Sequence, residues 1–165
     1  MSKHREVVMG RGVSSSPTVR ERLVSDRPVT ERQLGVAGIR TAVLEGGEGP
    51  PIVFLQAELA LVWSRVIPGL VGTHRVIVPE LPGIGGSDLP DGSYDIDVAL
   101  RWLGGLVEQT CDERPVLVGK GPAGALALRF AVEYGHRLAR LVLVDTHGLH
   151  RLRPPPGMAA SFVST

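Results

Sequence analysis

The sequence predicts an α/β protein with a mostly parallel sheet of about six strands and helices on both faces. Two observations indicate this class. Short, wholly apolar segments alternate along the chain with segments of helical periodicity, and the apolar segments have no polar face. A length of 165 residues, with 43% hydrophobic and 21% charged residues, suffices for one globular core.

The charge balance argues against polyanionic partners. Lys and Arg number 18 and Asp and Glu number 17, so the formal net charge is +1, and we expect no nucleic-acid or membrane partner. No apolar run approaches the ~20 residues that cross a bilayer, and the N-terminus lacks the apolar core of a secretory signal. The single cysteine, Cys111, excludes an internal disulfide and fits a reducing compartment. These features predict a cytoplasmic protein.

The chain divides into a leader and a domain. Residues 1–32 carry seven basic and four acidic side chains, show no sustained periodicity and contain a Ser-rich turn at 14–17. We expect a flexible basic leader there and one domain over residues 33–165. Organellar targeting and an acidic partner are open alternatives for the leader.

The first half of the domain contains four predicted strands and one predicted helix. Gly38 separates two apolar segments, which predicts an antiparallel pair. A helix is expected around Leu61, Trp63 and Ile67, with its end at Pro68, because proline cannot continue a helix. The strands of this half are 34–37, 39–44, 52–55 and 75–78.

The second half alternates helices and strands after a loop at 79–92. Apolar residues recur at helical spacing from Ile96 to Val107, and Asp95 and Asp97 favour the helix dipole in the first turn. A second helix is expected to open at Pro122 and to close near Gly135. The strands of this half are 116–118 and 141–144.

Ligands of such sheets bind beyond the carboxyl ends of the strands. The informative residues are therefore those that directly follow each strand. They are Gln56-Ala57-Glu58, the loop from Glu80 to Asp88, the turn from Gly119 to Gly124, and Asp145.

The turn after residue 118 has two interpretations. It reads Gly119-Lys120-Gly121-Pro122-Ala123-Gly124, which is G-x-G-x-x-G between a strand and a helix. This is the pattern that lets a backbone approach a pyrophosphate, so a flavin- or NAD(P)-binding turn is one alternative, with Asp145 as the ribose acid. The match falls late in the chain, whereas families that use it usually place it on the first strand.

The second interpretation explains more residues. The run Glu80-Leu81-Pro82-Gly83-Ile84-Gly85-Gly86-Ser87-Asp88 resembles the D-x-P-G-x-G-x-S-D loop of the α/β-hydrolase superfamily, with Glu80 in place of the Asp. Residues 115–145 are similar to that family's nucleophile elbow with its helix and next strand. The resemblance covers about residues 33–150. It implies hydrolysis of ester, epoxide or related bonds in small apolar molecules, and it implies that the C-terminal strands of the fold are missing.

The elbow departs from the family's chemistry. In the family, G-x-Ser-x-G holds a nucleophile on a strained turn whose neighbours are small, as Gly119, Ala123 and Gly124 are here. The nucleophile position holds Gly121, which has no side chain to attack a carbonyl. The next residue, whose backbone N–H serves the oxyanion hole, is Pro122, which has no N–H.

The other family positions also carry substitutions. The resemblance places the second oxyanion N–H at Glu58. Lys120 stands where relatives often have a His, and its side chain is either solvated or a cation of the site. Asp145 matches a position that some members use for the triad acid, or is an ordinary strand ending. Glu80 and Asp88 are expected to brace their loop. His74 and His136 are expected at the wrong end of the sheet, and His147 and His150 at the correct end.

These features predict a hydrolase-family protein that is catalytically impaired. A non-catalytic protein that binds a small apolar ligand or a protein partner is the alternative, beside the flavin or NAD(P) one. No cofactor is expected, and no Cys/His cluster has metal-ligand spacing. Because later strands are missing, Leu141–Val144 is expected as an uncovered edge through which the chain self-associates.

Overall fold

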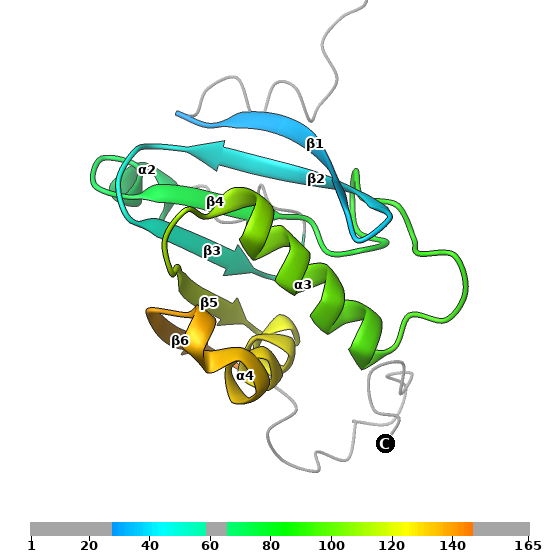
Figure 1. The fold of residues 1–165 in the computed structure, drawn as a ribbon. Coiled ribbons are helices and arrows are strands. Elements are labelled where there is room, and N and C mark those ends of the chain that lie inside the picture. The colour runs from blue at the N-terminus through cyan, green and yellow to red at the C-terminus, as the bar shows by residue number, and fades with distance from the viewer. Residues whose placement is uncertain (1–27, 59–65, 147–165) are drawn as a thin grey trace, which may run out of the picture.

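The fold is known from a computed structural model, which describes residues 28–58 and 66–146. A six-stranded mixed sheet has the order β1-β2-β4-β3-β5-β6 (Figure 1). The pairs β1–β2 and β2–β4 are antiparallel, and the pairs β3–β4, β3–β5 and β5–β6 are parallel. The strands are β1 Thr30–Val36, β2 Ile39–Gly46, β3 Pro51–Leu55, β4 Arg75–Pro79, β5 Val116–Lys120 and β6 Arg140–Val144. The predicted α/β class with a mostly parallel sheet is therefore confirmed.

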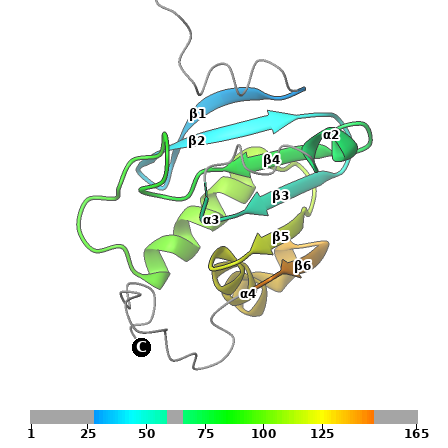
Figure 2. The ribbon, with the colours of Figure 1, turned by 180° about the vertical axis from the view of Figure 1, so that it is seen from behind.

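The helices cover both faces of the sheet. The helices α3 (Ile96–Thr110) and α4 (Ala123–Tyr134) lie on one face, and the 3-10 turn η2 (Gly135–Arg137) follows α4. The short α2 (Ile67–Leu70) lies on the other face, as the view from behind shows (Figure 2). None of the helices in the described ranges is long and apolar enough to cross a bilayer.

Alternating side chains of the central strands fill two separate cores. In β3, Val53 and Leu55 pack toward α3 and α4, whereas Ile52 and Phe54 pack toward α2. The same alternation continues in β4, where all residues but Arg75 are buried, and in β5, where all but Val116 and Lys120 are buried. A strand that is buried on both faces has no polar side, which explains why these segments are wholly apolar in the sequence.

Two predicted boundaries were wrong. The strand β1 begins at Thr30, four residues before the predicted start, so residues 30–32 of the expected leader belong to the sheet. Most of β1 is exposed at the edge of the sheet, and its polar side chains form no apolar pattern from which the strand could be predicted. Pro68 does not end a helix but lies in the first turn of α2, where its missing N–H costs no hydrogen bond. Leu61, Trp63 and residues 1–27 lie outside the described residues.

The strand β6 forms the other edge of the sheet. Its burial is low along its whole length, and Val142, Leu143 and Val144 are exposed. In the part of the chain that the structure describes, β5 is the strand that pairs with it. Self-association through this edge stays a prediction.

A buried hydrogen bond ties α3 to the sheet. The Trp102 Nε1–H donates to the Thr41 hydroxyl at 2.9 Å, and that hydroxyl donates to the carbonyl of Ile39 at 3.2 Å. Both side chains are fully buried. The indole N–H therefore has this hydroxyl, and not water, as its acceptor.

We predict that Thr41→Val lowers the free energy of unfolding by about 1–3 kcal/mol, because the isosteric valine leaves the buried indole N–H without an acceptor. Urea denaturation followed by tryptophan fluorescence measures the change. The matched control is Thr30→Val, since the Thr30 hydroxyl is in an exposed bond to the Glu45 carbonyl. Equal effects of the two variants would contradict the role given to Thr41.

Candidate active site

The carboxyl ends of four strands meet at one edge of the sheet. There Gln56 follows β3, Glu80 follows β4, Gly121 follows β5 and Asp145 follows β6. The strands β3 and β5 are neighbours, as are β5 and β6, so the segments that follow them lie side by side. This is the edge at which a ligand of a parallel sheet is expected.

The turn between β5 and α4 is sharp and closely packed. The Gly121 N–H donates to the Val144 carbonyl at 3.0 Å, and the Gly124 N–H donates to the Gly121 carbonyl at 3.1 Å. Gly121 has a φ of +55°, in the left-handed region that favours glycine. The chain thus reverses from strand to helix within two residues, Gly121 and Pro122.

Small residues are required on both sides of this turn. A Cβ added to Gly119 would lie 2.6 Å from the Cβ of Ala127 and 2.8 Å from the Cα of Gly124. A Cβ added to Gly124 would lie 2.2 Å from the hydroxyl oxygen of Thr146. The glycines therefore serve the contact of α4 with β5 and with the end of β6.

Gly121 itself is in a different environment. A Cβ added there would meet no heavy atom within 4 Å. A side chain at this position would project into open space. The position therefore lacks a functional group because its residue is glycine, and not because a side chain would find no room. The next residue, Pro122, is exposed and has no backbone N–H to offer to a ligand.

An ion pair joins the two segments beside this turn. The Lys120 ammonium donates to Glu58 Oε1 at 2.9 Å. This hydrogen bond lowers the pKa of the Glu58 carboxyl, and the backbone N–H of Glu58 itself adds to the effect, while burial opposes it. Sequence reasoning did not pair these residues. The pairing can be inferred only once the strand order is known, because Lys120 ends β5 and Glu58 follows β3, which is the strand beside β5.

The structure places Asp145 next to the turn. It follows β6 directly, one residue after Val144, whose carbonyl accepts from Gly121. Its φ is +47°, and its side chain is exposed. Aspartate tolerates this left-handed conformation better than most residues. His147 and His150 lie outside the described residues.

Glu80 and Asp88 brace their loop, as predicted. The Glu80 side chain is buried, and its Oε2 accepts from the Gly86 N–H at 2.7 Å. The Ser87 hydroxyl donates to the Glu80 carbonyl at 2.7 Å and accepts from the Ala42 N–H at 3.0 Å. Asp88 forms an ion pair with Arg40. These contacts attach the loop to β2.

His74 and His136 lie at the amino ends of the parallel strands, as expected. His74 precedes β4, and His136 lies in η2 before β6. Within the described ranges, both histidines are thus at the edge opposite Gly121. No group of three or more His, Cys, Asp or Glu side chains among the described residues is placed to hold a metal ion.

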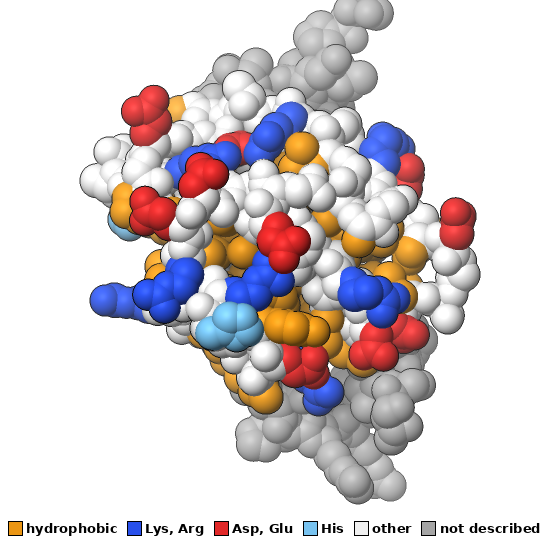
Figure 3. Space-filling view, in the orientation of Figure 1, with side chains coloured by type: hydrophobic (Ala, Val, Ile, Leu, Met, Phe, Trp, Pro, Cys, Tyr) orange, Lys and Arg blue, Asp and Glu red, His pale blue; other side chains and the backbone are white. Residues whose placement is uncertain are grey.

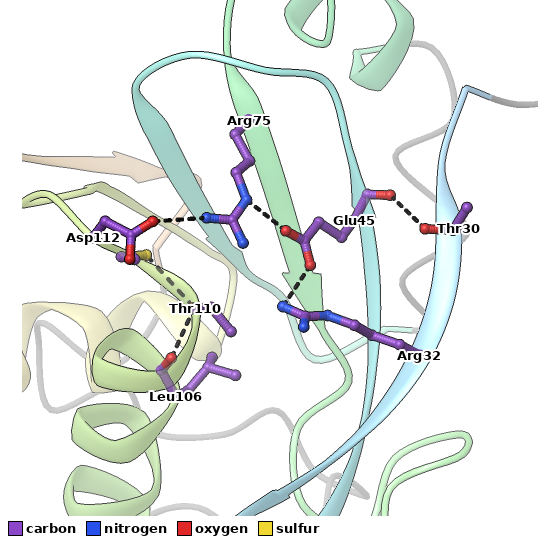
Figure 4. A network of polar contacts seen from close by, with 8 residues as sticks. Thr30, Arg32, Glu45, Arg75, Leu106, Thr110 and Asp112 are labelled. Carbon is purple, nitrogen blue, oxygen red and sulfur yellow. Dashed lines mark hydrogen bonds and ion pairs between the residues drawn. The ribbon is translucent and has the colours of Figure 1, made fainter.

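A polar network also occupies that opposite edge (Figure 4). Glu45 forms ion pairs with Arg32 and Arg75, and Arg75 lies 3.9 Å from Asp112. Burial raises the pKa of the neighbouring Cys111 thiol. A raised pKa leaves less of the thiolate, which is the reactive form of cysteine.

Acidic and basic side chains are interspersed on the face that carries α3 and α4 (Figure 3). Lys and Arg side chains lie beside Asp and Glu side chains over apolar surface.

The family model for the alpha/beta hydrolase fold matches residues 50–162. The chain belongs to the α/β-hydrolase family. The 2-hydroxymuconate semialdehyde hydrolase of Pseudomonas sp. strain CF600 is 33% identical over 128 residues, which are 74% of this chain and 45% of the relative. The 2-hydroxy-6-oxo-2,4-heptadienoate hydrolase of Pseudomonas putida is 33% identical over 124 residues, which are 72% of this chain and 45% of the relative.

A solved structure shows the same partial fold. The epoxide hydrolase VrEH1 from Vigna radiata superposes with a TM-score of 0.67 at 25% identity, over 70% of this chain and 38% of that chain. The chain thus spans less than half the length of these relatives. The turn from β5 to α4 joins a strand to a helix, as the family's nucleophile elbow does. That Gly121 stands at the nucleophile position stays a prediction.

We predict that Gly119→Ala lowers the free energy of unfolding by about 1–3 kcal/mol, because the added methyl overlaps Ala127 and Gly124. Thermal or urea denaturation measures the loss. Gly35→Ala is the matched control, since a Cβ there meets nothing within 4 Å. A Gly119→Ala protein as stable as the control would contradict the close packing of α4 on β5.

We predict that Lys120→Met raises the pKa of the Glu58 carboxyl toward its ordinary range. A lowered folded-state pKa means that the ion pair stabilises the fold above the pKa of an unfolded glutamate, and that this stabilisation is lost as the pH falls through the folded-state pKa. A carbon-detected NMR titration of the Glu58 carboxyl measures the midpoint. Lys120→Arg keeps the cation and should keep the midpoint low. An unchanged midpoint in Lys120→Met would show that the pair does not form in solution.

Proposed function

We propose that this chain is a hydrolase-family protein that binds a small apolar molecule at the carboxyl edge of its sheet but does not form a covalent intermediate with it. The observation that carries the proposal is Gly121. The turn has the left-handed backbone and close packing of an elbow, yet the residue that faces open space has no side chain. Without a hydroxyl or thiol at that position, no acyl group can be carried there.

The residues that surround Gly121 support the same conclusion. An oxyanion hole needs backbone N–H groups directed at the developing negative charge, and the loss of one donor costs about 10²–10³ in rate. Pro122 has no N–H. The other expected oxyanion position is Glu58, whose carboxylate accepts from Lys120. An ionised carboxylate opposes a second negative charge.

The relatives indicate the chemical class of the ligand. Their names describe hydrolases of a muconate semialdehyde, of a heptadienoate and of epoxides. We infer that the reaction of the family from which this chain derives is hydrolysis of ester, epoxide or related bonds in small apolar molecules. In this chain, the same edge then serves as a binding site, and the protein is a pseudoenzyme.

The flavin or NAD(P) alternative rests on the glycines of the β5–α4 turn. Two of these three glycines have contacts within the fold that account for them, since Gly119 packs on Ala127 and Gly124 packs on Thr146. No pyrophosphate is needed to explain their small size. Flavin absorbance of the purified protein, or thermal stabilisation by NAD(P), would nevertheless favour this alternative over the hydrolase-derived site.

We predict that the protein shows no saturable hydrolysis of p-nitrophenyl acetate and no labelling by a fluorophosphonate probe, because position 121 lacks a nucleophile. Gly121→Ser alone should not restore either activity, since the described histidines lie at the opposite edge of the sheet. Rates and labelling are measured against a heat-denatured control. Labelling of the unaltered protein would show that a different serine is the nucleophile. Strong labelling of Gly121→Ser would show that the chain supplies its own base.

A further inference from the structure

The ion pair between Lys120 and Glu58 lies at the centre of the candidate site. Lys120 immediately precedes Gly121, and Glu58 stands where the family resemblance predicts the second oxyanion N–H. The Lys120 side chain is 26% exposed and the Glu58 side chain 43% exposed. The pair is therefore accessible from solvent at the edge where a ligand is expected.

The Lys120 ammonium donates to the Glu58 carboxylate at 2.9 Å. Ammonium groups bind carboxylates in proteins through charge-assisted hydrogen bonds. Here the carboxylate that Lys120 binds belongs to the chain itself.

The neighbourhood favours a negative group in the same place. The 12-residue helix α4 begins at Ala123 and has no side chain that caps its N-terminus, so the positive end of its dipole lies near the turn. Next to Lys120, the position of Gly121 opens into free space. An atom placed where a Cβ of residue 121 would lie thus meets no heavy atom within 4 Å.

We propose that Lys120 binds the carboxylate of a small, otherwise apolar ligand, and that the Glu58 side chain occupies this place until the ligand displaces it. This inference rests on the proposed function, because it names the ligand class of the same edge. Exchange is feasible because ion pairs between exposed side chains contribute little stability. Lysine suits the role, since its ammonium is a compact charge on a flexible stem that can follow a new partner.

The alternative is an ion pair that only fastens the loop after β3 to the end of β5. The two roles differ in one respect. If the Glu58 carboxylate competes with a ligand for Lys120, removal of its charge makes a ligand carboxylate bind more tightly. If the ion pair only fastens the loop, breaking it weakens ligand binding or leaves it unchanged. Glu58→Gln removes the competing charge and keeps the size of the side chain, so it separates the two roles.

The test measures binding of benzoate, and of benzyl alcohol as its uncharged analogue, by NMR chemical-shift titration. We expect Glu58→Gln to bind benzoate about tenfold more tightly than the unaltered chain, if Glu58 occupies the place about nine-tenths of the time. Lys120→Met should lose benzoate binding, and Lys120→Arg should retain it. Benzyl alcohol should bind equally to all of these proteins. Glu113→Gln, on the exposed segment before β5 at the opposite edge, is the charge-matched control and should not change the affinity.

Two outcomes would overturn the inference. In the first, Glu58→Gln binds benzoate no more tightly than Glu113→Gln does. In the second, Lys120→Met binds it as well as Lys120→Arg does. Circular dichroism establishes that each variant is folded. If Glu58→Gln does not fold, the difference in benzoate affinity between Lys120→Arg and Lys120→Met still tests the inference. The proposed loss of covalent chemistry fails separately, through labelling by the fluorophosphonate probe, which does not depend on Lys120.

Discussion

The close contact between β5 and α4 is the constraint on which the rest of the candidate site depends. Only Gly121 and Pro122 separate the strand from the helix. The first turns of α4 lie so close to β5 that Gly119 admits no Cβ, and Gly124 admits none because of Thr146, which follows β6. Gly121, between strand and helix, has a left-handed conformation, and a Cβ added to it would meet no heavy atom within 4 Å. We propose that this turn presents residue 121 to a ligand. In this chain it presents only a hydrogen atom, and we propose that the site therefore binds without covalent attack.

The order of the strands decides what surrounds this turn. Because β3 and β6 flank β5, the segments that carry Glu58 and Asp145 lie on either side of Gly121. The loop after β4 is attached to β2 through the buried Glu80 and Ser87. The side chains of these two residues are engaged in that attachment. The charged groups nearest to the turn are thus the Lys120–Glu58 pair and Asp145. In our proposal, the charge that this edge offers to a ligand depends on whether Lys120 stays paired with Glu58 or exchanges it for the ligand.

Much of the fold was predictable from the sequence, because strands buried on both faces are apolar throughout and the helices between them carry an amphipathic pattern. The antiparallel pair at Gly38 and the helix from Ile96 are confirmed by the structure. The first residues of β1 were missed because an exposed edge strand needs few apolar side chains, and Pro68 was misplaced because proline favours the first turn of a helix as well as its end. The partner of Lys120 could not be inferred from local pattern, since Glu58 is 62 residues away and becomes adjacent only through the pairing of β3 with β5.

The central claim is that no side chain of this protein attacks a ligand at the elbow. Peptide mapping by mass spectrometry, after the protein has been mixed with p-nitrophenyl acetate and quenched with acid, tests it most directly. We predict that no serine, threonine or cysteine in the chain carries an acetyl group above the level seen in the unfolded protein. An acetyl group that accumulates rapidly on one such side chain of the folded protein would contradict it.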